Sequence, residues 1–271
     1  QLGQTDPMAR EFERTIANLT AVNPYTGATD RLLVRMADQT GMKALHMFTA
    51  GDPTRNASFV FFADPNYFIT DFPTNTCETC INPLFAWNHG DIQREIANIW
   101  LGFVGPGVRS QGQDGKTWSD HTDVRPTILS LVGLQDTYIH DGRVLTETID
   151  DHAVPKRLRD LKSTLPEFAH IYKQINAPFG RLALASLKIS TAALASGDAT
   201  DDSAYTALQN KIATITAQRD AIAVQMRAML DGAAFKDDVF DDVTARQLIN
   251  HAEALLEEVS RCAANVAHCA K

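Results

Sequence analysis

The densest group of potentially reactive side chains lies in residues 85–91, where the sequence reads Phe-Ala-Trp-Asn-His-Gly-Asp. Imidazole nitrogens and carboxylate oxygens are common ligands of divalent cations, and a glycine beside the histidine lets the backbone approach an ion closely. His89 and Asp91 are therefore candidate metal ligands. A histidine in this position could instead hydrogen-bond the loop backbone, and the local sequence leaves both interpretations open.

A second polar group occupies residues 120–123, Asp-His-Thr-Asp, directly before Val-Arg-Pro-Thr. Two carboxylates and an imidazole within four residues could bind a divalent cation, so His121 is a further candidate ligand. Aspartate and threonine also accept hydrogen bonds from the free N–H groups at a helix start. Because a proline at position 126 favours a helix start nearby, we expect Asp123 to cap that helix.

The four cysteines form two closely spaced pairs, Cys77 with Cys80 and Cys262 with Cys269. Four thiolates could hold a zinc ion, although six intervening residues are an unusual spacing for such a site. We favour structural disulfides, which form in an oxidising compartment and indicate a secreted or periplasmic protein. In a continuous helix Cys262 and Cys269 would lie ~10 Å apart, too far to bond. If these two pair with each other, the helix must break near Asn265.

The composition changes near residue 150 and divides the chain into two parts. Residues 1–150 contain 12 of the 15 glycines and 15 of the 21 aromatic residues, whereas alanine, leucine, lysine and glutamine are prominent after this point. Glycines and aromatic residues are typical of turns and packed strands, and the later composition favours helices. We predict an α/β domain over 1–150 and an all-α helical bundle over 151–271, with a boundary near 148–156.

Apolar runs and turn residues predict the elements of each part. Helices are expected at 6–19, 30–36, 91–99 and 126–133, and strands at 43–49, 58–63 and 100–104, with a short buried run at 83–87. The strand at 58–63 is apolar on both faces, which is typical of a central strand. After residue 151 we expect a broken first helix at 157–162 and 166–176, and further helices at 179–195, 201–230 and 244–268. Because their connections are short, an antiparallel bundle of about four helices is the natural packing.

Charge and hydropathy exclude two classes of partner. The net charge is −8, from 25 basic and 33 acidic residues, which is the wrong sign for binding a phosphate backbone, so nucleic acid is not expected as a partner. No apolar run approaches the ~20 residues that a membrane helix needs, so we predict no membrane span. The chain begins at Gln1 without a basic or apolar leader. We expect either that a leader has been removed or that the chain is part of a longer one.

Five motifs follow one another between residues 89 and 145: His-Gly at 89–90, Trp-Leu-Gly-Phe-Val-Gly-Pro-Gly-Val at 100–108, an Asp-Val-Arg-Pro-Thr helix start within 118–129, Gly-Leu at 133–134 and Asp-Gly-Arg-Val-Leu at 141–145. In type and order they resemble the C-terminal half of the catalytic domain of the alkaline phosphatase superfamily, in its phosphodiesterase and sulfatase branch. Residues 42–49 and 64–68 also resemble secreted bacterial members of that branch. The implied fold of residues 1–150 is a partial alkaline-phosphatase-like sheet with flanking helices.

The resemblance implies a metal-dependent phosphoester hydrolase. Such enzymes use a Thr or Ser nucleophile and two divalent ions, held by Asp and His, that bind the attacking and leaving oxygens of the phosphoryl group. His89 matches the late His-Gly metal ligand of the family, and Asp91, Asp120 and His121 lie in matching neighbourhoods. Zinc or manganese is the expected metal, and the substrate is expected to be a phosphoester.

The sequence departs from the family in residues 1–88, where the nucleophile and the earlier metal-binding motifs should lie. The only histidine there is His46, and it is followed by methionine rather than glycine. We therefore predict no catalytic residue in this chain, partial metal binding, and no activity without the missing N-terminal half of the catalytic domain as a partner. The sheet should then expose an edge that this half normally covers.

A second hypothesis comes from a different functional class. Without a nucleophile, the chain could be a stable non-catalytic module whose helical bundle mediates assembly or docking. A sulfatase is a less favoured variant of the first hypothesis, because neither Cys77 nor Cys80 lies in the Cys-x-Pro-x-Arg context of the sulfatase nucleophile.

Overall fold

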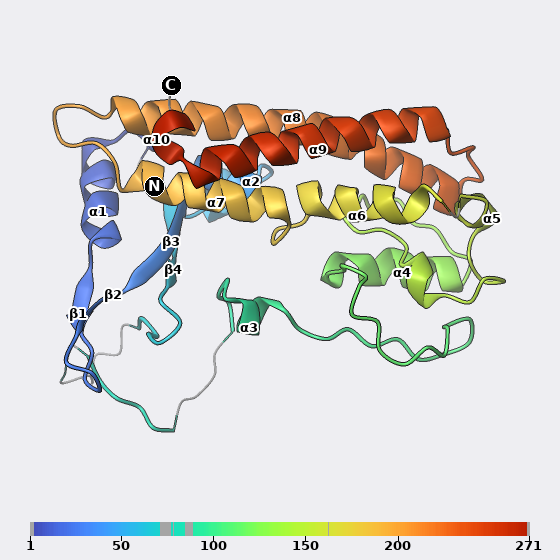
Figure 1. Cartoon of the computed structure of the whole chain (residues 1–271), viewed down its shortest axis with the longest axis horizontal. Coiled ribbons are helices and arrows are strands. Elements are labelled where there is room, and N and C mark those ends of the chain that lie inside the picture. The colour runs from blue at the N-terminus through green and yellow to red at the C-terminus, as the bar shows by residue number, and fades with distance from the viewer. Residues whose placement is uncertain (1–2, 71–76, 78, 85–88, 162, 270–271) are drawn as a thin grey trace. The chain divides into compact units, whose positions relative to one another are not determined.

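The computed structural model describes residues 3–70, 77, 79–84, 89–161 and 163–269. The described chain is rich in helices and contains two small two-stranded sheets (Figure 1). It divides into two compact units, each assembled from separate stretches of the chain. Unit 1 comprises Gln1–Ile99, Leu184–Thr214 and Arg261–Lys271, and unit 2 comprises Trp100–Ala183 and Ile215–Ser260. The boundary predicted near 148–156 from composition remains a prediction.

Unit 1 begins with α1 (Pro7–Ala17), which the sequence predicted from Asp6 onward. The Asp6 side chain accepts a hydrogen bond from the backbone N–H of Met8, and proline occupies the first helical position. Both features are favoured at a helix N-terminus. The antiparallel hairpin of β1 (Thr20–Val22) and β2 (Thr29–Arg31) follows.

The second sheet of unit 1 pairs β3 (Leu33–Asp38) antiparallel with β4 (Phe59–Ala63). The predicted helix at 30–36 is therefore wrong, because most of that segment lies in β2 and β3. The strand predicted at 43–49 is also wrong, because α2 (Gln39–Ala44) overlaps its beginning and no strand follows within 45–49. The cause is Asp38, whose carboxylate accepts from the N–H groups of Thr40 and Gly41 and starts a helix at the end of β3.

The remaining elements of residues 53–104 are short. A 3-10 turn, η1, spans Pro53–Arg55, and α3 covers only Arg94–Ala97 of the helix predicted at 91–99. Leu84, in the run predicted to be buried at 83–87, is 95% exposed, and residues 85–87 of that run lie outside the described part of the chain. Residues 100–104, predicted as a strand, are all described and form none.

The first helical element of unit 2 lies at the Asp-His-Thr-Asp motif. The 3-10 turn η2 (His121–Asp123) leads into α4 (Val124–Leu131), close to the predicted helix start. Gly133 follows this helix with a φ of 67°, a conformation that glycine adopts without strain. The 3-10 turn η3 (Thr146–Thr148) and the short helix α5 (Lys156–Arg159) come next.

Four longer helices follow, as the sequence predicted. They are α6 (Leu165–Asn176), α7 (Arg181–Leu194), α8 (Ser203–Phe235) and α9 (Asp242–Ala264), and the one-turn helix α10 (Val266–Cys269) ends the described chain. The apolar positions expected to face inward are buried, with the exception of Ile222, which is half-buried. The buried set is Leu208, Ile212, Ile215, Met226, Leu248, Leu255, Leu256 and Val259. No described helix combines the length and the hydropathy that crossing a lipid bilayer requires.

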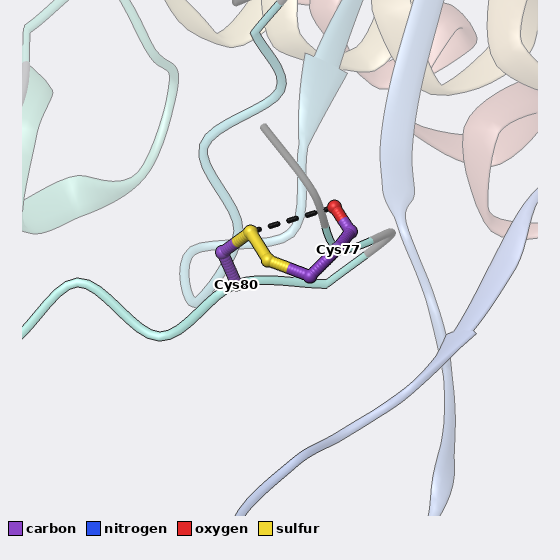
Figure 2. Close-up of a disulfide and its surroundings, with 2 residues drawn as sticks. All are labelled: Cys77 and Cys80. Carbon is purple, nitrogen blue, oxygen red and sulfur yellow. Dashed lines mark hydrogen bonds between the residues drawn. A yellow bond between two sulfur atoms is a disulfide. The ribbon is translucent and has the colours of Figure 1, made fainter. Parts of the chain in front are cut away.

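Both cysteine pairs form disulfides. Cys262 and Cys269 are bonded with their Cα atoms 4.8 Å apart, and the helix breaks at Asn265, between α9 and α10, as the spacing required. Figure 2 shows the second bond, between Cys77 and Cys80, whose Cα atoms are 5.6 Å apart. All four cysteines are used in this way, so the alternative of a four-thiolate zinc site does not apply.

Candidate functional site

His89 and Asp91, two of the predicted metal ligands, lie on a loop of unit 1. His89 is exposed, and Gly90 beside it has a φ of 86°, a conformation that disfavours any side chain. The half-buried Asp91 accepts a hydrogen bond of 2.7 Å from the backbone N–H of Ile92 through Oδ1, which leaves Oδ2 for another partner. Residues 85–88, which precede this pair, lie outside the described part of the chain.

The third predicted ligand, His121, is exposed and lies in unit 2 at the first position of η2. Within the ranges that the structure describes, no three or more His, Cys, Asp or Glu side chains are grouped so that they could hold a metal ion. The roles of His89, Asp91 and His121 as ligands stay predictions.

The two aspartates around His121 have a structural role, although Asp123 makes no side-chain cap to α4, the helix that it was predicted to cap. The Asp120 side chain accepts from the N–H of Thr122 at 2.8 Å, and the Asp123 side chain accepts from the N–H of Asp120 at 3.0 Å. This reciprocal arrangement is a capping box, which satisfies the free donors at the start of the turn.

A buried lysine that the sequence analysis missed completes this group. Lys173 of α6 places Nζ 3.0 Å from Asp123 Oδ1, 3.0 Å from Asp120 Oδ2 and 3.0 Å from the hydroxyl of Thr122. The side chains of Lys173 and Asp123 are 1% and 0% exposed. Burial raises the pKa of Asp123, and the positive charge of Lys173 opposes that rise. The only sequence signal was a lysine inside the otherwise mostly apolar run Ile-Tyr-Lys-Gln-Ile at 171–175.

The same aspartate ties the motif at 120–127 to the motif at 141–145. The backbone N–H of Arg143 donates to Asp123 Oδ1 at 2.8 Å, and that of Leu145 donates to the Thr127 hydroxyl at 3.0 Å. A side chain at Gly142 would overlap the carbonyl oxygen of Thr122, so only glycine fits there. Two of the motifs on which the family resemblance depends are thus joined into one hydrogen-bonded element.

The hydroxyls of both threonines in this element are engaged in hydrogen bonds within it. The hydroxyl of Thr127 is buried, donates to the carbonyl of Asp123 at 2.7 Å and accepts from Leu145. The hydroxyl of Thr122 donates to Asp120 Oδ1 and accepts from Lys173, so it is part of the buried ion-pair group. A catalytic hydroxyl needs a base that can take its proton and an open approach for the substrate. The element therefore has the character of a scaffold.

Unit 1 holds a second buried polar cluster, also missed by the sequence analysis. Arg10 of α1 pairs with Glu13 and, through Nε at 2.8 Å, with Asp202. Its guanidinium carbon lies 3.7 Å from the centre of the Tyr205 ring, and the hydroxyl of Tyr205 donates to Asp38 at 2.8 Å. Burial raises the pKa of Glu13 to about 7 and also raises that of Asp38.

A cavity of about 290 Å³ lies in unit 2 between the loop at 135–140 and the end of α8. The Nδ1 atom of His140 in its wall is buried without a hydrogen-bond partner in the described structure. Burial raises the pKa of Asp231 on the opposite wall, and the charges of His140 and Lys236 oppose this rise. The cavity contains none of the three predicted metal ligands.

Comparisons of the whole sequence with protein-family models, with curated proteins and with solved structures yield no match.

Proposed function

We propose that this chain forms part of a metal-dependent phosphoester hydrolase with an alkaline-phosphatase-like catalytic domain, secreted or located in the periplasm. The observation that carries the proposal is the hydrogen-bonded element formed by residues 120–127 and 141–145, together with the order of the motifs. Two segments that the resemblance selects independently are held together by Asp123 and Thr127. The two disulfides support an oxidising compartment.

In this proposal His89 supplies one imidazole ligand to a zinc or manganese ion. The exposed ring and the glycine after it leave room for an ion and for ligands from another segment. Such an ion, when bound, would stabilise the negative charge on the phosphoryl oxygens of a phosphodiester or monoester. Asp91, with one carboxylate oxygen not engaged by Ile92, and His121 are further candidate ligands. The nucleophile and the remaining ligands would come from polypeptide outside the residues named here.

The test replaces His89 by alanine in the hydrolase of which the chain forms part and measures metal content and hydrolysis of bis-p-nitrophenyl phosphate. Both should fall together, because one substitution removes a ligand of the ion that promotes the reaction. His152→Ala is a matched control, because His152 is also an exposed loop histidine. Unchanged metal content in His89→Ala would count against the proposal.

A second assay uses the 271-residue chain alone with zinc or manganese added. We expect no turnover of bis-p-nitrophenyl phosphate or p-nitrophenyl phosphate, because no nucleophile motif occurs in residues 1–88. Metal-dependent turnover by this chain would show that a nucleophile is present and that the prediction of an incomplete site is wrong.

The alternative of a module for assembly through the helical bundle has less support. The exposed large apolar side chains of α7 to α9 are Leu184, Val224 and Val243, one on each helix. Single exposed apolar residues are normal on protein surfaces and do not form a docking stripe.

A further inference from the structure

The cavity between the loop at 135–140 and the end of α8 contains polar groups that no described residue satisfies. The carboxylate of Asp231 is half-buried and makes no hydrogen bond or ion pair with any residue that the structure describes. The Nδ1 atom of His140 is buried and lacks a partner there as well. Because leaving a buried polar group unsatisfied costs free energy, such groups in a cavity indicate a place for a ligand with polar atoms.

The other two charged residues in the wall differ in how they are engaged. Asp136 is fully used, because its Oδ2 accepts from Arg125 at 2.8 Å and its Oδ1 accepts from the N–H of Tyr138 at 3.1 Å. Lys236, directly after the end of α8, is exposed and forms no ion pair within the described ranges. One carboxylate and one ammonium group, those of Asp231 and Lys236, are therefore free to bind a ligand.

The free groups lie close enough to act on one another. Burial raises the pKa of Asp231, and the positive charges of His140, Arg227 and Lys236 oppose that rise. Arg227 is already paired with Asp141 at 3.1 Å. The cavity thus combines one acceptor, the carboxylate, with an ammonium group and an imidazole ring that can donate hydrogen bonds. A ligand that satisfies all three groups must carry both signs of charge.

The rest of the cavity suits a small apolar group. Leu129 of α4, Phe235 of α8 and Ile139 of the loop contribute apolar side chains to its wall. Sites for drug-sized ligands occupy ~300–1,000 Å³, so a cavity of about 290 Å³ has room for one small molecule. Removing an apolar group of that molecule from water would favour its binding.

We propose that this cavity binds a free α-amino acid with an apolar side chain, with its ammonium group on Asp231 and its carboxylate on His140 and Lys236. Both charged groups of such a molecule are attached to one carbon atom, so they fit together into a small site. A simple amine would leave His140 and Lys236 unsatisfied, and a simple acid would leave Asp231 so. The site is separate from the proposed hydrolase function, because the cavity contains none of the three predicted metal ligands.

The test measures the dissociation constants of four small molecules for the 271-residue chain by isothermal titration calorimetry. L-leucine carries both charged groups and an apolar side chain. The compound 3-methylbutylamine lacks its carboxylate, 4-methylpentanoate lacks its ammonium group, and glycine lacks its apolar side chain. We expect leucine to bind, and each of the other three to bind at least about tenfold more weakly, because each loses one class of contact.

Two variants assign the two ends of the ligand. Asp231→Asn should weaken the binding of leucine and of 3-methylbutylamine about tenfold, and should not weaken that of 4-methylpentanoate. Lys236→Gln should weaken leucine and 4-methylpentanoate about threefold and spare the amine; the effect is smaller because the lysine is exposed to water. Glu253→Gln and Lys188→Gln remove the same charges from exposed positions on α9 and α7, and should change none of these constants. Far-UV circular dichroism confirms that each variant is folded.

Three results would overturn the proposal. The first is no saturable binding of leucine with a dissociation constant below about 10 mM. The second is binding of 3-methylbutylamine or 4-methylpentanoate as tight as that of leucine, which would mean that the cavity recognises only one charge. The third is a leucine affinity that responds equally to the cavity variants and to the control variants, which would place the bound molecule elsewhere on the chain.

Discussion

Replacing Lys173 by methionine isolates the contribution of the buried ion pair in unit 2. The change preserves most of the side-chain volume and removes the charge. Asp123 would then keep its hydrogen bonds from the backbone N–H groups of Asp120 and Arg143 but lose its buried cation. The perturbation therefore tests an unpaired buried carboxylate rather than a cavity.

The size of the effect follows from burial. Removing one partner of a fully buried pair costs roughly 3–5 kcal/mol, because the remaining charge is left without compensation. The side chains of Lys173 and Asp123 are 1% and 0% exposed, and two backbone donors still serve Asp123. We therefore expect a loss of about 3 kcal/mol in the free energy of unfolding near neutral pH, at the lower end of that range.

The pH dependence of the stability loss provides an independent test of its cause. Without Lys173, the pKa of Asp123 should rise further above its ordinary value, since the positive charge that opposes the burial effect is gone. The folded variant would then bind this proton more tightly than the unfolded chain does. The loss should accordingly be largest near neutral pH and shrink as the pH falls toward the ordinary range of aspartate.

Urea unfolding followed by far-UV circular dichroism measures both effects. Lys188→Met on the exposed surface of α7 is the control and should change stability little. A loss below about 1 kcal/mol in Lys173→Met, the range of an exposed pair, would refute the reasoning. So would a loss that stays the same at acidic pH.

Two further predictions concern stability in the other buried contacts. Gly142→Ala should lower the free energy of unfolding by roughly 1–3 kcal/mol, because the new methyl group overlaps the carbonyl of Thr122. The control Gly115→Ala has open space around it and should leave the stability measured by thermal unfolding unchanged. Equal losses in the two variants would contradict this explanation. Burial raises the pKa of Glu13 to about 7 from 4.5, so the chain should lose stability as the pH rises through that window. Glu13→Gln imitates the protonated form of Glu13. The difference between the urea midpoints of the variant and the wild type should therefore increase in favour of the variant between about pH 5 and pH 8. If the two midpoints change with pH in parallel, Glu13 does not titrate in that range.

The long helices were predictable because each carries its own periodic apolar positions. The helix predicted at 166–176 is α6 (Leu165–Asn176), and the one predicted at 201–230 is α8 (Ser203–Phe235). Even the break at Asn265 followed from cysteine spacing and helix geometry alone. These features depend on residues that are close in sequence.

The two errors have different causes, one a contact with a distant part of the chain and the other a local helix cap. Residues 30–36 were predicted as a helix, but β3 is held by β4 and by Thr191 of α7, 155 residues beyond Met36. The predicted strand at 43–49 failed because the cap supplied by Asp38 was not recognised. Neither contact can be read from an apolar pattern.

The candidate site was predictable in part. Asp123 was expected to cap the helix that follows it; it makes no side-chain cap to α4 and instead takes part in the capping box of η2, whose N-cap is Asp120. The partnership of Asp123 with Lys173 could not be predicted, because the two residues are 50 positions apart and a lysine in a helix is normally exposed. The metal-ligand role of His89 remains a prediction.

The Arg10 cluster has a consequence for the timing of folding. Arg10 is synthesised early, whereas its ion-pair partner Asp202 is synthesised 192 residues later. At typical rates of synthesis that interval lasts roughly 10–40 s. During this time α1 lacks its ion pair with Asp202 and the carbonyl oxygens at the end of α7 that its arginine binds. The ion pair and the hydrogen bonds of Arg10 can therefore form only after α7 and the residues up to Asp202 have been synthesised.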